Sequence, residues 1–253
     1  MSTKYLYLRA MNQSIKPNAN KPETKKIQVR EMFDGISYRY DLLNRIITLG
    51  IDVLWRKRVV KLLQKENPKK ILDIATGTGD LVLELATLNT EKIIGLDLSP
   101  GMLAIGKQKV KNKGLENRIE MQLGDSEALA FEDNHFDGVT IAFGVRNFEN
   151  LNLGLQEIFR VLKPKGTLVI LETAVPENPF LNFFYRAYSQ KIMPFIGKLF
   201  SKDRSAYQYL SDSAAIFTCG EAFNNILRKN GFKEVESFPQ TLGVSSIYFA
   251  KKP

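Results

Sequence analysis

The chain has 253 residues, 44% of them hydrophobic and 25% charged, a composition typical of soluble globular proteins. No apolar run reaches the roughly 18 residues that a membrane-spanning helix needs, and the N-terminus lacks the continuous apolar region of a signal peptide. The single cysteine excludes an internal disulfide, so we expect a cytoplasmic protein. A single histidine excludes a His-rich metal site, and we expect no metal. The net charge of +9 is compatible with nucleic acid, an anionic membrane or an anionic substrate.

The N-terminal part of the chain divides into a tail and a helical segment. Residues 1–28 are polar and Lys-rich toward their end, and we expect a flexible basic tail. Residues 29–253 are expected to form one domain, which starts with a helical segment over residues 29–66. There, "VREMFDGISYRYDLLNRIITLG" and "DVLWRKRVVKLL" place apolar residues at three- and four-residue spacing, with a break at Gly50.

Strands and helices alternate from residue 69 onward. The predicted strands are "KKILDIA", "KIIGLDL", "IEMQLGD", "FDGVTIAFG" and "TLVILET"; the helices between them are "DLVLELATL", "SPGMLAIGKQKVKNKG" and "NLGLQEIFRVLKPKG". Ser99 is expected to cap the second helix, and Pro164 and Gly166 to end the third. A last helix, "TCGEAFNNILRKNGF", precedes two strands joined by a turn at 241–243. This alternation indicates an α/β fold with a mostly parallel seven-stranded sheet flanked by helices.

Residues 174–217 interrupt this alternation. Most of the segment is rich in aromatic residues and prolines, and it is too long for a plain connection and too apolar for a loose one. We therefore expect an aromatic-rich helical cap over the carboxyl edge of the sheet.

The first two strands end in groups that suit a ligand. In an open parallel sheet, ligands bind beyond the carboxyl ends of the strands. The first strand carries Asp73 and runs into Gly77 and Gly79, which let a ligand approach the backbone closely. The second ends on Asp97, which can accept hydrogen bonds from two vicinal ribose hydroxyls.

The next two strand ends complete the predicted site. Asp125 and Ser126 follow the third strand and can bind an adenine amino group, while the small Ala142 leaves room beside the reactive part of the ligand. The run D-x-x-x-G-x-G lacks the third glycine of the dinucleotide fingerprint G-x-G-x-x-G, and no G-x-x-x-x-G-K-[ST] motif occurs. An adenosine ligand without pyrophosphate fits this pattern. We therefore predict S-adenosylmethionine (SAM) as the cofactor, with its amino acid end over the glycine loop.

The chain resembles the class I SAM-dependent methyltransferases and, more narrowly, is similar to the demethylmenaquinone/ubiquinone C-methyltransferase family. The stretches that carry the resemblance are "FDGISYRYDLLNRIITLGID", "WRKRVV", "LDIATGTGDL", "GDSEALAFEDNHFDGVTIAFGVRNFEN", "LKPKGTLVILE" and "YQYLSDSAAIF". The resemblance implies a Rossmann-like methyltransferase fold and SAM contacts at Thr78, Asp97, Asp125, Ser126 and Ala142. The position of Ala142 is often a serine in relatives, so only the backbone can bind there.

The resemblance also implies C-methylation of a polyprenylated hydroquinone, and we expect conversion of demethylmenaquinol to menaquinol. Loss of a phenolic proton, whose ordinary pKa is about 10, raises the electron density on the ortho carbon. Arg146 could stabilise the phenolate or orient a water, and Asn147 could fix the hydroxyl. The alternative for Arg146 is a structural pair with an acid such as Glu149.

Residues of the helical segment and the cap are further candidates. Tyr40 and Asp41, with Asn44, could belong to a lid in which the Tyr40 ring touches the cofactor cation, or to a cluster that anchors the helix. Aromatic residues of the cap could line a slot for the isoprenoid tail or form plain core: Phe180, Phe183, Phe184, Tyr185, Tyr188, Phe195 and Phe200. A basic tail would suit peripheral contact with an anionic inner-membrane surface, through Lys16, Lys21, Lys25 and Lys26.

Three other functions remain open. One is methylation of a ubiquinone-pathway benzoquinol or of another small lipid. A nucleic-acid methyltransferase is more remote, because enzymes that methylate base amines usually end the fourth strand with Asp/Asn-Pro-Pro-Tyr/Phe and this chain has "IAFGVRN"; we expect no nucleic-acid partner. The last is a SAM-binding protein without catalysis, against which Arg146 and Asn147 beside an intact loop argue.

Overall fold

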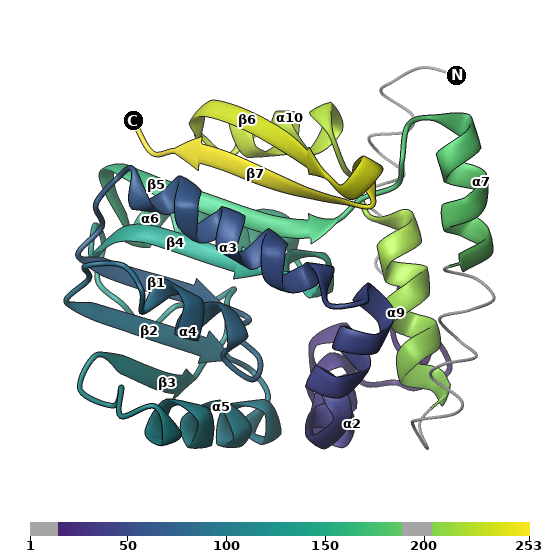
Figure 1. Ribbon diagram of the computed structural model, residues 1–253, viewed down its shortest axis with the longest axis horizontal. Helices are drawn as coiled ribbons and strands as arrows, with labels where there is room; N and C mark the ends of the chain where they lie inside the picture. The colour runs from purple at the N-terminus through teal and green to yellow at the C-terminus, as the bar shows by residue number, and fades with distance from the viewer. Residues whose placement is uncertain (1–14, 189–203) are drawn as a thin grey trace.

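A twisted sheet forms the centre of the protein (Figure 1). The computed structural model describes residues 15–188 and 204–253. Its strands are β1 (Lys70–Ile74), β2 (Lys92–Asp97), β3 (Ile119–Leu123), β4 (Phe136–Ala142), β5 (Leu162–Thr173), β6 (Lys233–Gln240) and β7 (Ser245–Lys251), in the order β3-β2-β1-β4-β5-β7-β6. The first five run parallel, and β7 pairs antiparallel with β5 and β6. The mostly parallel seven-stranded sheet is therefore confirmed.

Helices cover both faces of this sheet. The helical elements are α2 (Lys25–Thr48), α3 (Ile51–Gln64), α4 (Asp80–Leu85), α5 (Pro100–Asn112), η1 (Val145–Asn147), α6 (Leu151–Val161), α7 (Pro179–Ala187), α9 (Arg204–Ile216), α10 (Glu221–Lys229) and η3 (Thr241–Gly243). Helices α3, α4 and α5 pack on one face, and α6 and α10 pack on the other. Within the described residues, no helix combines the length and the apolarity that a bilayer crossing requires.

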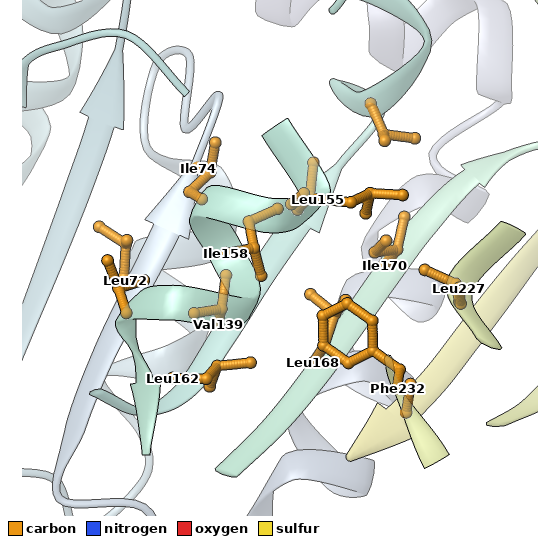
Figure 2. Close-up of a cluster of buried hydrophobic side chains, with 14 of the residues drawn as sticks. Leu72, Ile74, Val139, Leu155, Ile158, Leu162, Leu168, Ile170, Leu227 and Phe232 are labelled. Atoms are coloured by element: carbon orange, nitrogen blue, oxygen red, sulfur yellow. The ribbon is translucent and has the colours of Figure 1, made fainter. Parts of the chain in front are cut away.

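The core lies on both faces because side chains alternate along each strand. Leu72 and Ile74 of β1 point toward α6 and α10 and pack in the cluster of Figure 2. Ile71, which directly precedes Leu72, points to the opposite face and belongs to the cluster under α3, α4 and α5. A strand that is buried on both faces needs apolar residues at nearly every position, which explains the continuous runs in the sequence.

The N-terminal helix lies across the carboxyl ends of the parallel strands rather than on a face. Figure 1 shows α2 and α9 on the side to which the arrows of β1, β4 and β5 point. Helix α2 begins at Lys25, earlier than residue 29, because the Thr24 hydroxyl accepts a hydrogen bond from the Ile27 N–H. Its buried side packs against α5 and α9 through Val29, Met32, Ile36, Leu43, Met102 and Leu210.

The predicted end of the helix before β5 is also wrong. Helix α6 ends at Val161, and β5 begins at Leu162, so "LKPKG" is strand and not the end of the helix. A residue before proline avoids the helical backbone, which favours an extended Lys163 ahead of Pro164. Mutual backbone hydrogen bonds also tie this extension to the chain after β7, since Lys165 N–H binds the Lys252 carbonyl and Lys252 N–H binds the Gly166 carbonyl.

Candidate active site

The loop after β1 brings open backbone to the carboxyl edge of the sheet. Gly77 has φ of +57°, and a Cβ there would meet no atom within 4 Å, so its face is free for a ligand. Gly79 has φ of +81° and caps α4, and a Cβ there would lie 3.3 Å from the Met121 Cε. Only Gly77 therefore fits the predicted close approach of a ligand, because Gly79 is required by the turn and by packing.

The Asp73 side chain fixes this loop through hydrogen bonds. Its carboxylate is buried and accepts hydrogen bonds from the Thr76 and Thr140 hydroxyls, both at 2.6 Å. Burial raises the pKa of Asp73 to about 7, and the two hydroxyls act against that rise. Asp73 thus joins the loop to β4, and the structure gives it protein hydroxyls as partners.

Asp97 stands at the end of β2 on the wall of a cavity. One carboxylate oxygen accepts the Gly77 N–H at 2.7 Å, and the other accepts the Ser99 N–H at 2.9 Å. Burial raises the pKa of Asp97. Each oxygen keeps a further lone pair, so the carboxylate is fixed in place and can still accept two hydroxyls.

The first cavity, as we call it, has Asp97 on its wall and α2 as its roof. The carboxyl ends of β1 to β4 contribute Gly77, Leu98, Gly124, Ser126, Ala142 and Asn147, and α2 contributes Lys26, Val29, Phe33 and Tyr40. The sequence predicted the sheet side of this cavity but not Val29 or Phe33. Their three- and four-residue spacing indicated an amphipathic helix without indicating what the helix covers.

Asp125 and Ser126 have different surroundings. Ser126 is buried on the cavity wall. The Asp125 carboxylate instead accepts hydrogen bonds from the Lys26 ammonium at 2.7 Å and from the Glu127 N–H at 2.9 Å. The Lys26 ammonium also lies 3.2 Å from a Glu127 oxygen. The start of α2 is thereby bound to the loop after β3.

Lys25 binds the loop after β4. Its ammonium donates to the carbonyls of Arg146 and Phe148 at 3.0 and 2.8 Å, and its backbone N–H donates to Glu149. Burial lowers the pKa of Lys25 to about 8. The prediction that Lys25 and Lys26 face a membrane is therefore wrong, because both hold α2 over the cavity.

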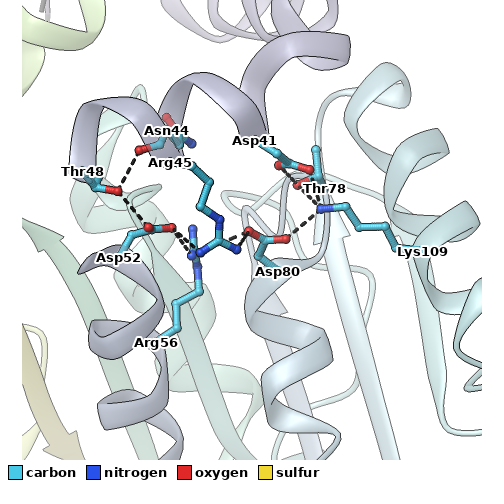
Figure 3. Close-up of polar contacts among 9 residues, drawn as sticks. All are labelled: Asp41, Asn44, Arg45, Thr48, Asp52, Arg56, Thr78, Asp80 and Lys109. Carbon is cyan, nitrogen blue, oxygen red and sulfur yellow. Dashed lines mark hydrogen bonds and ion pairs between the residues drawn. The ribbon is translucent and has the colours of Figure 1, made fainter. Parts of the chain in front are cut away.

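A polar network fixes the middle of α2 (Figure 3). Asp41 accepts a hydrogen bond from the Thr78 hydroxyl at 2.5 Å and pairs with Lys109, which also pairs with Asp80. Asp80 in turn lies within ion-pair distance of arginines on both α2 and α3, Arg45 and Arg56. Thr78 and Asp41 line a small cleft beside the first cavity, together with Tyr40 and Gly77.

A second cavity of about 310 Å³ lies between α2, α3, α7 and α9. Its wall is mostly apolar and includes Tyr40, Asn44, Ile47, Trp55, Phe143, Arg146, Tyr185, Tyr188, Leu210 and Ala214. The rings of Tyr40 and Phe143 line this cavity, the first cavity and the small cleft. The two cavities therefore adjoin at these rings.

Arg146 lines the second cavity, as does a second buried arginine, Arg56. One of the Arg146 terminal nitrogens donates to Glu172 at 2.5 Å and to the Phe143 carbonyl at 2.8 Å. Burial lowers the pKa of Arg146, but the charge and hydrogen bond of Glu172, together with the hydroxyl groups of Tyr40 and Tyr209, more than offset this, so the pKa is raised and Arg146 stays a cation. Its Nε is buried and has no hydrogen-bond partner among the described residues. The expected alternative partner, Glu149, binds Lys25 instead.

Asn147 faces the other cavity. Its side chain lines the first cavity, and its Oδ1 accepts a hydrogen bond from the Tyr209 hydroxyl of α9 at 3.2 Å. Arg146 and Asn147 are adjacent in sequence, yet they reach the cavities on either side of the Phe143 ring because η1 turns the chain between them.

The aromatic cap divides in two. Tyr185 and Tyr188 line the second cavity, and the Tyr188 hydroxyl donates to the Ile47 carbonyl at 2.5 Å. The prediction fails for the other three aromatic residues of α7, which lie exposed on its outer side: Phe180, Phe183 and Phe184. Phe195 and Phe200 lie outside the described residues.

Comparisons with known proteins agree with this architecture. The profile of the ubiE/COQ5 methyltransferase family matches residues 21–252. A demethylmenaquinone methyltransferase of Bacteroides fragilis is 43% identical over 241 residues, which are 95% of this chain and 98% of that protein. A ubiquinone/menaquinone biosynthesis C-methyltransferase UbiE of Geotalea daltonii is 43% identical over 227 residues, covering 89% and 96% of the two chains.

Solved structures share the fold at low sequence identity. A SAM-dependent methyltransferase of Thermotoga maritima, described as a possible histamine N-methyltransferase, is 18% identical with a TM-score of 0.60, covering 88% of this chain and 99% of that one. A Haemonchus contortus phosphoethanolamine N-methyltransferase 2 is 19% identical with a TM-score of 0.61, covering 88% and 60%. The predicted class I methyltransferase fold is thereby confirmed.

Proposed function

The chain belongs to the ubiE/COQ5 methyltransferase family, and we propose that it transfers a methyl group from SAM to a ring carbon of a polyprenylated hydroquinone. Its relatives named demethylmenaquinone methyltransferase favour demethylmenaquinol as the substrate and menaquinol as the product. The name ubiquinone/menaquinone C-methyltransferase of another relative supports a benzoquinol of the ubiquinone pathway as a second candidate. Turnover of the two hydroquinones in competition distinguishes these substrates.

The residues around the first cavity fit SAM. Asp97 offers two fixed acceptors for the ribose hydroxyls, and Ser126 lies where the adenine would bind beside the apolar residues of α2. The free face of Gly77 and the Thr78 hydroxyl suit the amino acid end. SAM, when bound there, supplies an electrophilic methyl group. Ala142 and the Tyr40 ring border the position where the cation would lie.

The observation that carries this proposal is the Arg146 guanidinium on the wall of a mostly apolar cavity, with a buried Nε that has no hydrogen-bond partner among the described residues. A buried donor without a partner is costly, so the site favours a ligand that presents an acceptor there. A hydroquinone oxygen is such an acceptor, and the apolar wall suits the ring and its isoprenoid tail. The Glu172 pair keeps Arg146 charged, so Arg146 stabilises a phenolate and does not remove its proton.

Asn147 and Tyr40 would position the reacting groups. Asn147 is held by the Tyr209 hydroxyl and keeps its amide on the first cavity, next to the Phe143 ring. Tyr40 borders both cavities. Its ring would therefore stand between the bound cofactor and the bound hydroquinone, beside the path of the methyl group. Asp41 acts through Thr78 and Lys109 by keeping α2 closed over the cofactor.

Substitution of Arg146 tests the proposal. Arg146→Gln should lower kcat by roughly 10² to 10³, the usual effect of losing one donor to a developing oxyanion, and leave the Kd for SAM within about twofold. The rate maximum should also shift to higher pH, because the phenol then ionises nearer its ordinary pKa of about 10. Arg160→Gln is the matched control, since Arg160 forms ion pairs with Glu157 and Asp133 away from both cavities. An unchanged kcat in Arg146→Gln would contradict the assigned role.

We also propose that the enzyme works in the cytoplasm and contacts the anionic membrane that holds its lipid substrate. The polyprenyl tail supports this, because such a substrate resides in the bilayer. The net charge of +9 supports attraction to anionic lipid. Lys25 and Lys26 do not contribute, so the attraction must come from other cations.

A further inference from the structure

Two leucines combine an unfavourable left-handed backbone with an exposed apolar side chain. Leu49, after α2, has φ of +52° and is 82% exposed, and Leu242 in η3 has φ of +59° and is 71% exposed. The left-handed backbone is costly for a residue with a branched side chain, and asparagine or glycine is the usual choice. Because the side chains are exposed, they form few packing contacts that could offset the cost of this backbone conformation. Neither leucine is explained by the stability of the isolated chain.

Leu49 lines the second cavity, and Leu242 directly follows Thr241, which also lines it. Among the described residues of its wall, Leu49 and Thr241 are the exposed ones, so this part of the cavity reaches the surface between the end of α2 and η3. Thr241 accepts a hydrogen bond from the Trp55 indole N–H at 2.9 Å, which joins η3 to α3. Leu242 follows Thr241, and Leu54, 64% exposed, precedes Trp55. We call Leu49, Leu54 and Leu242 the leucine rim.

A basic surface continues from the rim along α3. The exposed side of this helix and its C-cap residue carry four cations at positions that continue the line of Leu54 along the helix, namely Lys57, Arg58, Lys61 and Lys65. The acid of α3, Asp52, is buried and bound to Arg56. Exposed leucines beside a basic helix face are the pattern of a surface that inserts shallowly into anionic lipid.

Helix α7 extends the apolar character on the other flank of the cavity. One side of α7 faces the cavity with Tyr185 and Tyr188, and Tyr188 binds the carbonyl of Ile47 near the rim. Its other side carries exposed phenylalanine rings that contact one another. In Figure 1, α7 stands at the outer edge beyond α9. A helix that is apolar on both sides suits an apolar surrounding better than water.

We propose that the leucine rim and the basic face of α3 dock on an anionic lipid bilayer, with the second cavity opening toward the acyl chains. The prenyl tail then reaches the cavity without crossing water. The role of docking in substrate uptake rests on the proposed function, whereas docking itself does not. A second copy of the chain is a poor partner for this surface, because it would set one basic face against another.

Vesicle flotation with the full-length protein tests the docking. The probes are vesicles of phosphatidylcholine alone and of phosphatidylcholine with an equal amount of phosphatidylglycerol. We expect the double variant Leu49→Asn/Leu242→Asn to lose roughly tenfold or more of its partition into the mixed vesicles, since a buried leucine side chain gains well over the equivalent of a tenfold factor. Its melting temperature should not fall, because asparagine tolerates the left-handed backbone.

Two further variants make the test specific. Leu123→Asn is the matched control, because Leu123 is also 64% exposed but lies on β3 at the opposite edge of the sheet, and it should float like the wild type. The triple variant Lys57→Gln/Arg58→Gln/Lys61→Gln should lose about fivefold per removed charge on mixed vesicles, with little effect on phosphatidylcholine alone. Equal flotation of the wild type and the leucine double variant would overturn the proposal. Absence of wild-type flotation would do the same.

A kinetic comparison separates docking from function. With a long-chain hydroquinone in mixed vesicles, the kcat/KM of the leucine double variant should fall at least tenfold further than with a short-chain hydroquinone dispersed in water. Equal losses on both substrates would overturn the link between docking and uptake. If wild-type protein floats as expected but methylates neither hydroquinone, the proposed function fails and the docking surface stands.

Discussion

Replacement of Asp97 by asparagine removes one fixed acceptor from the first cavity. In the wild type, each oxygen of Asp97 accepts one backbone N–H, from Gly77 and from Ser99. An asparagine has a single oxygen, so its amide nitrogen must face one of these two donors. One backbone N–H then loses its partner, and only one side of the residue can accept a ribose hydroxyl.

The magnitude follows from this count. A hydrogen bond to a charged group contributes about 1.5 to 3 kcal/mol, so loss of one ribose contact should weaken SAM binding by roughly 10- to 150-fold. The unpaired backbone donor costs about 1 to 3 kcal/mol of folding free energy. For a chain of this size that loss corresponds to a fall in Tm of about 2 to 12 °C.

Titration calorimetry with SAM and thermal unfolding without SAM measure the two effects. The control is Asp137→Asn, at the opposite end of β1, where one carboxylate oxygen accepts the backbone N–H groups of Lys69 and Lys70 and the other pairs with Lys163, a pair that asparagine removes. It should lower Tm and leave the Kd for SAM unchanged. The reasoning is refuted if Asp97→Asn and Asp137→Asn bind SAM equally well.

Three more substitutions give separate tests. Gly77→Ala should reduce SAM affinity at least tenfold while costing only about 1 to 2 kcal/mol in stability, since its Cβ would point into open space, and equal Kd values by calorimetry would argue against it. For Asp73, the folded-state pKa of about 7 exceeds the ordinary 3.8, so folding favours the protonated form. Relative to Asp73→Asn, wild-type stability in urea should therefore fall by up to about 4 kcal/mol as pH rises from 4 to 7 and level off above, and a rise would contradict the assignment. Asp41→Asn should speed SAM dissociation about 5- to 30-fold in stopped flow, because α2 loses its pair with Lys109, whereas an unchanged rate would remove Asp41 from the closure.

The sequence predicted features that depend on local spacing, such as a helix N-cap or the residue at the end of a strand. Ser99 caps α5 with its hydroxyl, as its place before Pro100 indicated. Asp97 ends β2 and Ala142 ends β4 on the wall of the same cavity, because the carboxyl ends of parallel strands share one edge. In these cases strand order and local spacing determine the position of the side chain.

Pairings across the fold could not be predicted in the same way. Arg146 binds Glu172, which lies 26 residues away on β5, because the register of β4 with β5 brings the two strand ends together. Lys25 is buried against carbonyls more than 120 residues away, although its sequence neighbours are polar. Phe180 belongs to an aromatic pattern that is compatible with a cavity wall, but its side chain is exposed on the outer side of α7. Periodicity shows which residues share a face of a helix, and it does not show what that face packs against.

The measurement that tests the central claim most directly is methyl transfer from labelled SAM to detergent-solubilised demethylmenaquinol, with the oxidised quinone as a parallel substrate. We expect label on the reduced quinone and none on the oxidised form, because only the hydroquinone can supply the phenolate that Arg146 stabilises. Transfer to both forms would contradict the phenolate mechanism. Transfer to neither, with SAM bound normally, would contradict the proposed substrate.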